Sequence, residues 1–208
     1  MPTSKRFPKR SGKSPPKARF PDCRPMEIAL RPARPDDAEE MARWFANLAS
    51  LAEWGGPEIR FPLTDDQVAA WIAEGSNERP RICFTAIDDR DLPVGHVQFL
   101  CDPPHRWARL GRFGIAPARR GQGFGRALFD YAVRYAFVDL DVEHLALAVV
   151  PSNELARDLY LRSGFRDDGA APGAWTVGGK SYVINQMSLT RPEWLRRTAA
   201  VGRQAAVS

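Results

Sequence analysis

Arg120-Gly121-Gln122-Gly123-Phe124-Gly125-Arg126 is the stretch that decides the fold of this chain. It lies between a strand-like run, residues 109–116, and an amphipathic run that predicts a helix over residues 124–137. The first turn of a helix has amide N–H groups without intrahelical partners, and the helix dipole makes that end partly positive. Glycines let the backbone approach a ligand closely, and arginines donate charge-assisted hydrogen bonds to phosphate oxygens. The stretch therefore predicts a site for phosphate or pyrophosphate.

The spacing within this stretch excludes two other phosphate-binding loops. Arg126 stands where the Gly-x-Gly-x-x-Gly of a dinucleotide fold needs its third glycine, and no acidic residue closes a following strand in the ribose-binding position. The Gly-Lys-Ser/Thr of a P-loop is missing as well. The remaining pattern, Arg120-x-x-Gly123-x-Gly125, resembles a signature of the GNAT superfamily of acyl-CoA-dependent N-acyltransferases. Taken alone, it also fits a glycine-rich turn that only caps a helix.

A second pattern further along the chain supports the same resemblance. Residues 145–150 are an unbroken apolar run, typical of a strand buried on both faces. A helix start follows, with Ser152 or Asn153 as N-cap, and Gly164 is placed to end that helix. The whole string resembles the second GNAT signature and reads Asn153-x-x-Ala156-x-x-x-Tyr160-x-x-x-Gly164-Phe165. The two signatures occur in the order and at the separation that the family shows.

The resemblance implies an architecture. The expected fold is α/β (α+β), with a mixed, mostly antiparallel central sheet of six to seven strands flanked by four helices. One pair of parallel strands in this sheet is expected to be splayed. We expect the N-acetyltransferase domain to span residues 26–190, after a basic leader over residues 1–25. A C-terminal tail over residues 191–208 completes the chain, and we expect a short helix in it around Trp194.

The resemblance also implies a reaction, the direct transfer of an acetyl group from acetyl-CoA to an amine in a ternary complex. Asn153 would bond the pantetheine arm of the cosubstrate, and Tyr160 would lie beside the thioester sulfur. Because a phenol has a pKa of about 10, Tyr160 can protonate the departing thiolate. The alternative for Tyr160 is a core aromatic on the buried stripe of its helix. The pyrophosphate would contact Arg120, Gly121, Gln122, Gly123, Phe124, Gly125 and Arg126.

The strand before the glycine-rich stretch contains an irregularity. Its apolar alternation changes phase between Leu110 and Phe113, across Gly111. A slip of one residue predicts a β-bulge. By resemblance, this bulge would splay the strand from its parallel neighbour and expose backbone groups to pantetheine. We therefore add Phe113, Gly114 and Ile115 to the cofactor-binding set, with the main chains of Phe113 and Ile115 as the pairing groups.

The general base is not evident in the sequence. Many family members have a glutamate on the strand before the glycine loop, but residues 109–112 contain no carboxylate. His96 lies on the predicted polar face of its strand and is one candidate; His105 and Asp102 are others. A lone strand histidine is more often structural or solvent-facing. A water chain that ends on backbone carbonyls remains an equal alternative.

The acceptor would bind near residues 51–62, which connect the first two predicted helices. This segment offers an aromatic wall, Trp54 and Phe61, and two acids, Glu53 and Glu58, that can hold a cationic amine. Trp54 can equally serve only to pack the segment down. The expected acceptor is a primary amine of a small molecule. A protein N-terminal amine and a non-catalytic acyl-CoA sensor are the alternatives, and the protein can be a monomer or a homodimer.

Composition sets the compartment and excludes some classes. The chain has 208 residues and three widely spaced cysteines, Cys23, Cys83 and Cys101, without a Cys-x-x-Cys pair. This excludes a disulfide framework and a zinc site, predicts that no metal is needed, and fits a reducing, cytoplasmic location. Cys83 and Cys101 are best interpreted as small core residues. No apolar run approaches the roughly 18 residues that a membrane span requires.

The basic character of the chain comes from its leader. Residues 1–25 hold eight lysines and arginines against Asp22, a net charge of +7, and the whole chain carries +5, which leaves −2 for residues 26–208. The leader has too few apolar residues to collapse, so we expect disorder, and it lacks the apolar core of a secretory signal. Its alternatives are a tether to nucleic acid or the ribosome, a dispensable tail, or translation from Met26. Because residues 26–208 carry a net negative charge, the last two alternatives are favoured over the tether.

Four local predictions complete the sequence analysis. An apolar stripe predicts one helix from Asp37 through Leu48. The Thr64–Gln67 segment predicts a capping box for a second helix. A hairpin is expected around residues 89–91. A turn at residues 178–179 is expected to lead into one last strand over residues 181–189.

Overall fold

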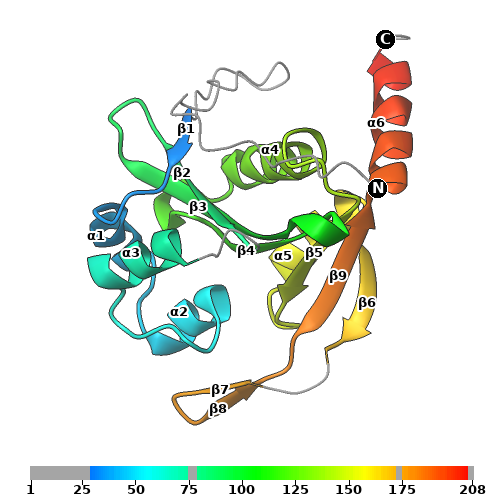
Figure 1. Ribbon diagram of the computed structural model, residues 1–208. Helices are drawn as coiled ribbons and strands as arrows, with labels where there is room; N and C mark the ends of the chain where they lie inside the picture. The colour runs from blue at the N-terminus through cyan, green and yellow to red at the C-terminus, as the bar shows by residue number, and fades with distance from the viewer. Residues whose placement is uncertain (1–28, 75–78, 172–174, 206–208) are drawn as a thin grey trace.

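The computed structural model describes residues 29–74, 79–171 and 175–205 (Figure 1). The leader over residues 1–25, and with it the predicted disorder, lies outside the described residues. In the described chain the main sheet has seven strands, in the spatial order β1 (Ala29–Pro32), β2 (Arg81–Ile87), β3 (Pro93–Asp102), β4 (Trp107–Ile115), β5 (His144–Val149), β9 (Asn185–Thr190) and β6 (Arg166–Ala170). The predicted hairpin around residues 89–91 is confirmed as the β2–β3 connection.

One strand pair differs from the rest of the sheet. All neighbours pair antiparallel except β4 and β5, which run parallel. Their pairing covers only Trp107–Arg109 of β4 against His144–Ala146 of β5. Beyond that point the two strands continue without pairing, so the sheet opens between them. The expected mostly antiparallel sheet with a splayed parallel pair is confirmed.

Helices cover both faces of the sheet (Figure 1). One face is packed by α1 (Asp37–Ala42), α2 (Leu48–Gly55) and α3 (Asp65–Ala73). The other face carries α4 (Phe124–Val138) and α5 (Glu154–Arg162), which share a core with the strands. With α6 (Arg191–Ala205), the terminal helix expected around Trp194, the described residues form six α-helices; the four helices expected at the sheet are five, because the first of them is divided.

The first expected helix is in fact two helices. The chain leaves the helical conformation after Ala42 and starts α2 at Leu48. A capping box causes the new start: Asn47 Oδ1 accepts from the Ser50 amide at 3.0 Å, and Ser50 Oγ accepts from the Asn47 amide at 3.3 Å. The apolar stripe continues across the break, which is why the sequence pattern concealed it.

The capping box expected at Thr64 is absent. Thr64 is the N-cap of α3 but makes no side-chain cap hydrogen bond. The Gln67 side chain instead accepts from the Arg60 amide at 2.8 Å and donates to the carbonyls of Arg60 and Pro62. Gln67 therefore holds the loop before α3 in place rather than capping the helix.

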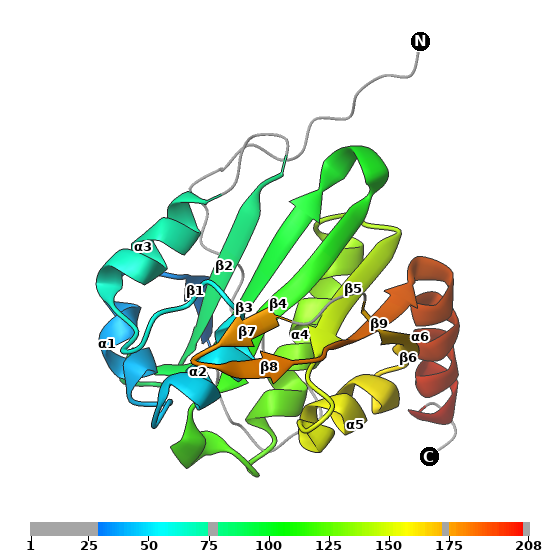
Figure 2. The ribbon, with the colours of Figure 1, turned by 90° about the horizontal axis from the view of Figure 1, so that it is seen from below.

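The end of the chain is more elaborate than expected. The last predicted strand is divided into β8 (Lys180–Tyr182) and β9, and β8 pairs with an additional strand, β7 (Trp175–Val177). The predicted turn at Gly178 and Gly179 is confirmed, with φ values of 55° and 78°. The β7–β8 hairpin lies beside α2 (Figure 2), where Lys180 Nζ pairs with Glu53 at 3.2 Å. The terminal helix α6 is fifteen residues long rather than short, and Trp194 anchors it by stacking on Phe137.

A buried carboxylate ties α1 to the sheet. The Asp37 side chain is almost fully buried and accepts from Arg31 at 2.6 and 2.9 Å, from the Arg34 amide at 2.9 Å and from Thr85 Oγ1 at 2.7 Å. Burial alone would raise the pKa of Asp37, but these hydrogen bonds hold the pKa below its ordinary value. Asp37 is thus ionised and fully paired at neutral pH.

Candidate active site

The predicted bulge is present in β4. Gly111 faces Gln98 of β3, whereas Gly114 faces His96, so β4 has one more residue than β3 between these pairs. Arg112 is in the left-handed region at φ 46°, which marks it as the irregular residue. The phase change between Leu110 and Phe113 is therefore confirmed as a bulge.

Backbone groups of β4 face the opening between β4 and β5. The Ala116 amide donates to the Val94 carbonyl of β3 at 2.9 Å. In an antiparallel ladder the next pair, Ile115 with Gly95, is then of the non-bonded type, so the Ile115 N–H and C=O point away from β3. Phe113 has no partner in the register because it lies in the bulge. The Ile115 carbonyl accepts from Arg120, so the Ile115 N–H and the backbone of Phe113 are the groups that fit the proposed main-chain role.

The glycine-rich stretch forms the first turn of α4, as the sequence predicted. Gly123 is the N-cap at φ 87°, and Gly121 has φ 71°, conformations that favour glycine. Within the described residues, no hydrogen bond uses the amide N–H groups of residues 121–126. These amides and the positive end of the helix dipole are therefore available to bind an anion at the mouth of α4.

The side chains of this stretch differ in how free they are. Arg120 Nε donates to the Ile115 carbonyl at 3.1 Å, and no carboxylate in the described chain pairs with its guanidinium. Arg126 is paired with Asp130 at 2.6 Å. The Gln122 side chain donates to the Ala118 carbonyl. Of the predicted side chains, Arg120 is thus the best placed to bind a phosphate.

Asn153 begins α5 at the carboxyl end of β5. Its Oδ1 accepts from the Ala156 amide at 3.2 Å, so Asn153 rather than Ser152 is the N-cap. The side-chain amide nitrogen of Asn153 has no partner in the part of the chain that the structure describes. The exposed Asn153 side chain can therefore still donate a hydrogen bond to a pantetheine carbonyl.

Tyr160 lies in an aromatic cluster near the bulge. Its ring is 4.9 Å from Phe129, 6.3 Å from Phe165 and 6.5 Å from Phe113 of β4, measured between centroids. The ring is thus a core aromatic, and it contacts the strand that splays. Burial raises the pKa of Tyr160 above its ordinary range, so the hydroxyl is protonated and can donate. The helix ends as predicted, because Gly164 has φ 95° and the Phe165 amide donates to the Tyr160 carbonyl.

His96 does not have the properties of a general base. It is fully buried under α2, and burial lowers its pKa to about 3. Gln98 Oε1 accepts from Arg81 and Arg112, so the Gln98 amide nitrogen donates to His96 Nε2 at 3.0 Å. The remaining nitrogen, Nδ1, then carries the ring proton. The interpretation of His96 as a base on a polar face is therefore wrong.

The other two base candidates lie away from the bulge. His105 pairs with Asp102 at 2.9 Å in the β3–β4 connection, just before the first residue of β4. Strand rise places this connection roughly 15–20 Å along β4 from the bulge. Neither side chain is thus brought to the opening between β4 and β5.

The predicted acceptor segment is used partly for packing. Trp54 packs between Phe45 and Trp71, with ring centroids 4.9 and 5.9 Å away, as the simpler interpretation of Trp54 predicted. Glu53 forms an ion pair with Lys180 of the β7–β8 hairpin. Phe61 and Glu58 remain exposed.

Sequence reasoning missed a buried polar cluster beneath α2. Arg112, pushed out by the bulge, stacks over the Trp71 ring at 4.1 Å and donates to Gln98 at 2.8 Å and to the Gly55 carbonyl at 3.3 Å. Burial lowers the pKa of Arg112 to about 10, which leaves it charged at neutral pH. The sequence does contain a signal for this cluster, because the apolar alternation of the strand changes phase next to Arg112.

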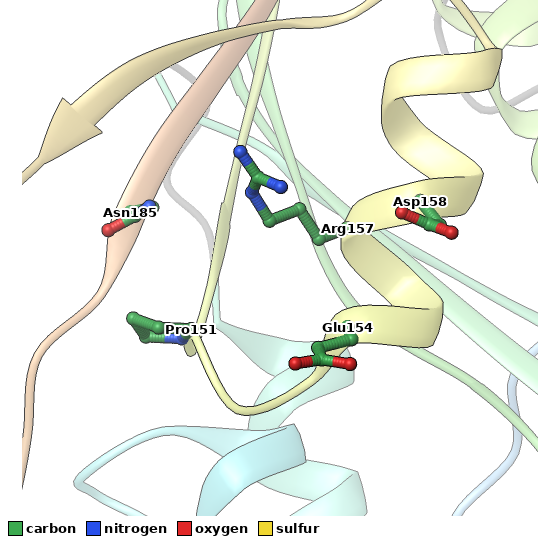
Figure 3. A pocket seen from close by; sticks show the side chains of 5 residues that line it. All are labelled: Pro151, Glu154, Arg157, Asp158 and Asn185. Atoms are coloured by element: carbon green, nitrogen blue, oxygen red, sulfur yellow. The ribbon is translucent and has the colours of Figure 1, made fainter.

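A shallow cavity of about 410 Å³ adjoins the start of α5 (Figure 3). Its lining residues come from the β5–α5 turn, α5 and β9, and are Pro151, Glu154, Arg157, Asp158 and Asn185. Arg157 is paired with Asp167, so the cavity has no free cation for a phosphate among the residues described. Across the described chain there is no cluster of three potential metal ligands, and no helix has the length and apolarity to cross a membrane.

Known proteins share both the sequence pattern and the fold. Residues 27–166 match the family model of the acetyltransferase (GNAT) domain. The chain is 30% identical over 116 residues to a spermidine N(1)-acetyltransferase of Vibrio cholerae, covering 55% of this chain and 66% of that protein. It is 30% identical over 93 residues to a putative ribosomal N-acetyltransferase, YdaF, of Bacillus subtilis, covering 45% of this chain and 50% of that protein.

A solved structure agrees with the observed topology. The crystal structure of a spermidine N-acetyltransferase from Vibrio cholerae, in complex with CoA and spermine, superposes with a TM-score of 0.68 at 22% identity. The superposition covers 81% of this chain and 98% of that one. The family model covers most of the chain and both signatures up to Phe165. The chain therefore belongs to the GNAT acetyltransferase family and is an acyltransferase enzyme.

Proposed function

We propose that the protein transfers an acetyl group from acetyl-CoA to the primary amine of a small molecule, by direct attack in a ternary complex. The observation that carries this proposal is the set of unpaired amides at residues 121–126, next to the opening between β4 and β5. A diphosphate satisfies these amides, and the opening leads from them towards Tyr160 and the bulge. The CoA-bound relative supports the same cosubstrate.

Each candidate residue has a distinct role in the proposed acetyl transfer. The amine nitrogen forms a bond to the thioester carbonyl carbon, the carbon–sulfur bond breaks, and the nitrogen loses a proton to solvent water, which returns a proton to Tyr160 after the thiol has left. Tyr160 donates its hydroxyl proton towards the departing sulfur, because burial keeps the hydroxyl protonated. Asn153 and the backbone of Phe113 and Ile115 hold the pantetheine arm in register with β4. Arg120 and the amides of the α4 mouth bind the diphosphate.

The proton of the amine leaves without help from His96. Since the pKa of His96 is about 3, His96 stays neutral throughout the range in which the enzyme works. We therefore expect kcat/KM to rise with pH as the protonated acceptor amine loses its proton, and to show no step near pH 6.5. Profiles measured with two acceptors of different amine pKa check this, since a step that stays fixed near pH 6.5 would contradict it.

Acetyl-CoA binding tests the proposed function most directly. Arg120→Ala is expected to weaken acetyl-CoA binding by about 10- to 100-fold, because it removes charged hydrogen bonds to phosphate. Arg134→Ala is the matched control, since Arg134 is an exposed arginine further along α4. Calorimetric titration of both variants and the wild type gives the comparison. A wild-type protein that fails to bind acetyl-CoA would refute the proposal.

A second candidate function is the acetylation of protein N-terminal amines. The similarity to a putative ribosomal N-acetyltransferase favours it. Release of thiol from acetyl-CoA, measured with a panel of small amines and of short peptides, separates the two candidates. Turnover with peptides alone would support the second.

A further inference from the structure

Two ring N–H groups beside the bulge have no acceptor. His96 Nδ1 and Trp54 Nε1 are both buried and unpartnered within the described residues. Their rings are 5.9 Å apart. His96 faces Gly114 across the β3–β4 ladder, and Trp54 Nε1 lies 2.7 Å from where a Cβ on Gly114 would be. Both donors therefore lie over the same point of β4.

Neither group can turn into an acceptor. An indole nitrogen only donates, and His96 Nδ1 carries the ring proton because Nε2 accepts from Gln98. Buried donors are nearly always satisfied in native proteins, because an unsatisfied one costs free energy. Two such donors at one place need an oxygen acceptor, which a water molecule or a ligand can supply.

A buried cation, Arg112, lies beside this place. Arg112 donates to neutral acceptors, Gln98 and the Gly55 carbonyl, and has no carboxylate partner in the described ranges. The nearby Arg81 is already paired with Glu74 at 2.8 Å. On the same face of the sheet, Asp37 is paired with Arg31. Glu74 and Glu58 act on Arg112 only over a distance, and neither forms an ion pair with it within the described residues. A buried guanidinium without a direct ion pair favours an anionic partner.

We propose that the acceptor is a primary amine that also carries a carboxylate, and that His96, Trp54 and Arg112 bind this carboxylate. This inference rests on the proposed function and specifies its substrate class. The carboxylate accepts from the two ring N–H groups and neutralises Arg112, while the amine lies towards the opening between β4 and β5. A polyamine has no oxygen for these donors and brings positive charge next to Arg112.

The position of the cluster explains why it acts on the acceptor. Gly114, Trp54 and His96 are on the face of the sheet covered by α1, α2 and α3. Tyr160 and the side chain of Phe113 pack with α4 on the other face. The acceptor thus approaches the bulge from the α2 face, opposite the ring that serves the thiolate.

Matched amines test the inference without any variant. Each amino acid is compared with its decarboxylated amine and its carboxamide, for example lysine with cadaverine and lysinamide, and spermidine is included. With saturating acetyl-CoA and thiol release as the readout, we expect the carboxylate to lower KM for the acceptor by about 10- to 100-fold. Comparing KM rather than kcat separates binding from differences in amine reactivity.

A pair of tryptophan variants tests the residues. Trp54→Phe keeps an aromatic ring but removes the N–H, and it is expected to reduce the carboxylate preference by about 10-fold while acetyl-CoA affinity is unchanged. Trp44→Phe is the matched control, because Trp44 Nε1 is also buried and unpartnered within the described chain but lies in the α1–α3 core. It is expected to keep the preference.

The outcomes are distinct. Equal or lower KM for the decarboxylated amines or the carboxamides overturns the carboxylate site while leaving amine acetylation intact. A carboxylate preference that survives Trp54→Phe overturns the assignment of these residues. The absence of thiol release with every amine, despite acetyl-CoA binding, overturns this inference and the proposed function together.

Discussion

Tyr160→Phe is expected to lower kcat by about 10²- to 10⁴-fold, the contribution typical of a positioned general acid, while acetyl-CoA affinity stays the same. The substitution keeps the ring that packs on Phe129 and Phe165, and removes only the hydroxyl. Since burial raises the pKa of Tyr160, the wild-type hydroxyl is a protonated donor over the whole working range. Thiol release and calorimetric titration with acetyl-CoA provide the two measurements.

Tyr135→Phe is the matched control for this change. Tyr135 is a half-buried tyrosine in which burial also raises the pKa, to about 12, and it packs on Phe84 and Phe99 in the α4 core. Its variant is expected to retain turnover. Full turnover in Tyr160→Phe would exclude the acid role, and a wild-type protein that binds acetyl-CoA but never releases thiol would be a sensor instead.

Asp37→Ala is expected to lower the free energy of unfolding by about 3–5 kcal/mol. The substitution removes one partner of a buried pair and leaves the Arg31 guanidinium and the Thr85 hydroxyl without their acceptor. Asp91→Asn is the matched control, because Asp91 contacts the same arginine at 3.4 Å from an exposed position and asparagine tolerates its φ of 60°. It should cost less than about 1 kcal/mol. Urea denaturation of the three proteins gives the comparison.

The effect of Asp37 also has a predicted pH dependence. Its folded-state pKa is depressed, so its stabilising contribution is fully present above the unfolded value of about 3.9 and is lost as pH falls through the lower folded value. The difference in unfolding free energy between the wild type and Asp37→Asn should therefore shrink in strongly acidic solution. A difference that stays constant down to pH 2 would contradict the ionised state of Asp37.

The sequence was most informative where backbone geometry depends on a few residues. Gly121 and Gly123 adopt the positive φ that a tight turn into α4 requires, and the phase change beside Gly111 corresponds to a real bulge. Such local requirements are encoded by the residues themselves. The splayed pair and the mixed sheet followed from the family resemblance rather than from any pattern of residues.

Sequence reasoning failed where polar residues interrupt a continuing apolar pattern. Helical periodicity continues past Asn47, although its capping box with Ser50 starts a new helix. Apolar residues likewise continue between Tyr182 and Asn185, where β8 gives way to β9. In the first place a local capping box ends the regular helix, and in the second the chain passes from one sheet to another. The pattern of apolar residues does not change at either point, so it could not predict these breaks.

The cosubstrate half of the candidate site could be proposed from the sequence, and the acceptor half could not. The glycine-rich stretch, Asn153 and Tyr160 belong to motifs of consecutive residues, so the sequence alone was enough to propose them. His96 looked solvent-facing because alternation assigns it to a polar face, yet α2 covers that face with Trp54. The partners of Arg112 are likewise distant in sequence, which places them beyond pattern analysis.

The short β4–β5 ladder has a mechanical consequence. The strands β1–β4 and the strands β5, β9 and β6 are joined by only three residue pairs of backbone pairing. The two halves are held together mainly by apolar side chains of α4, such as Phe129 and Leu128, which are buried in the core they share. The width of the gap is therefore set by side-chain volume under α4. Shortening Phe129 would widen the gap and would also remove packing from the Tyr160 ring.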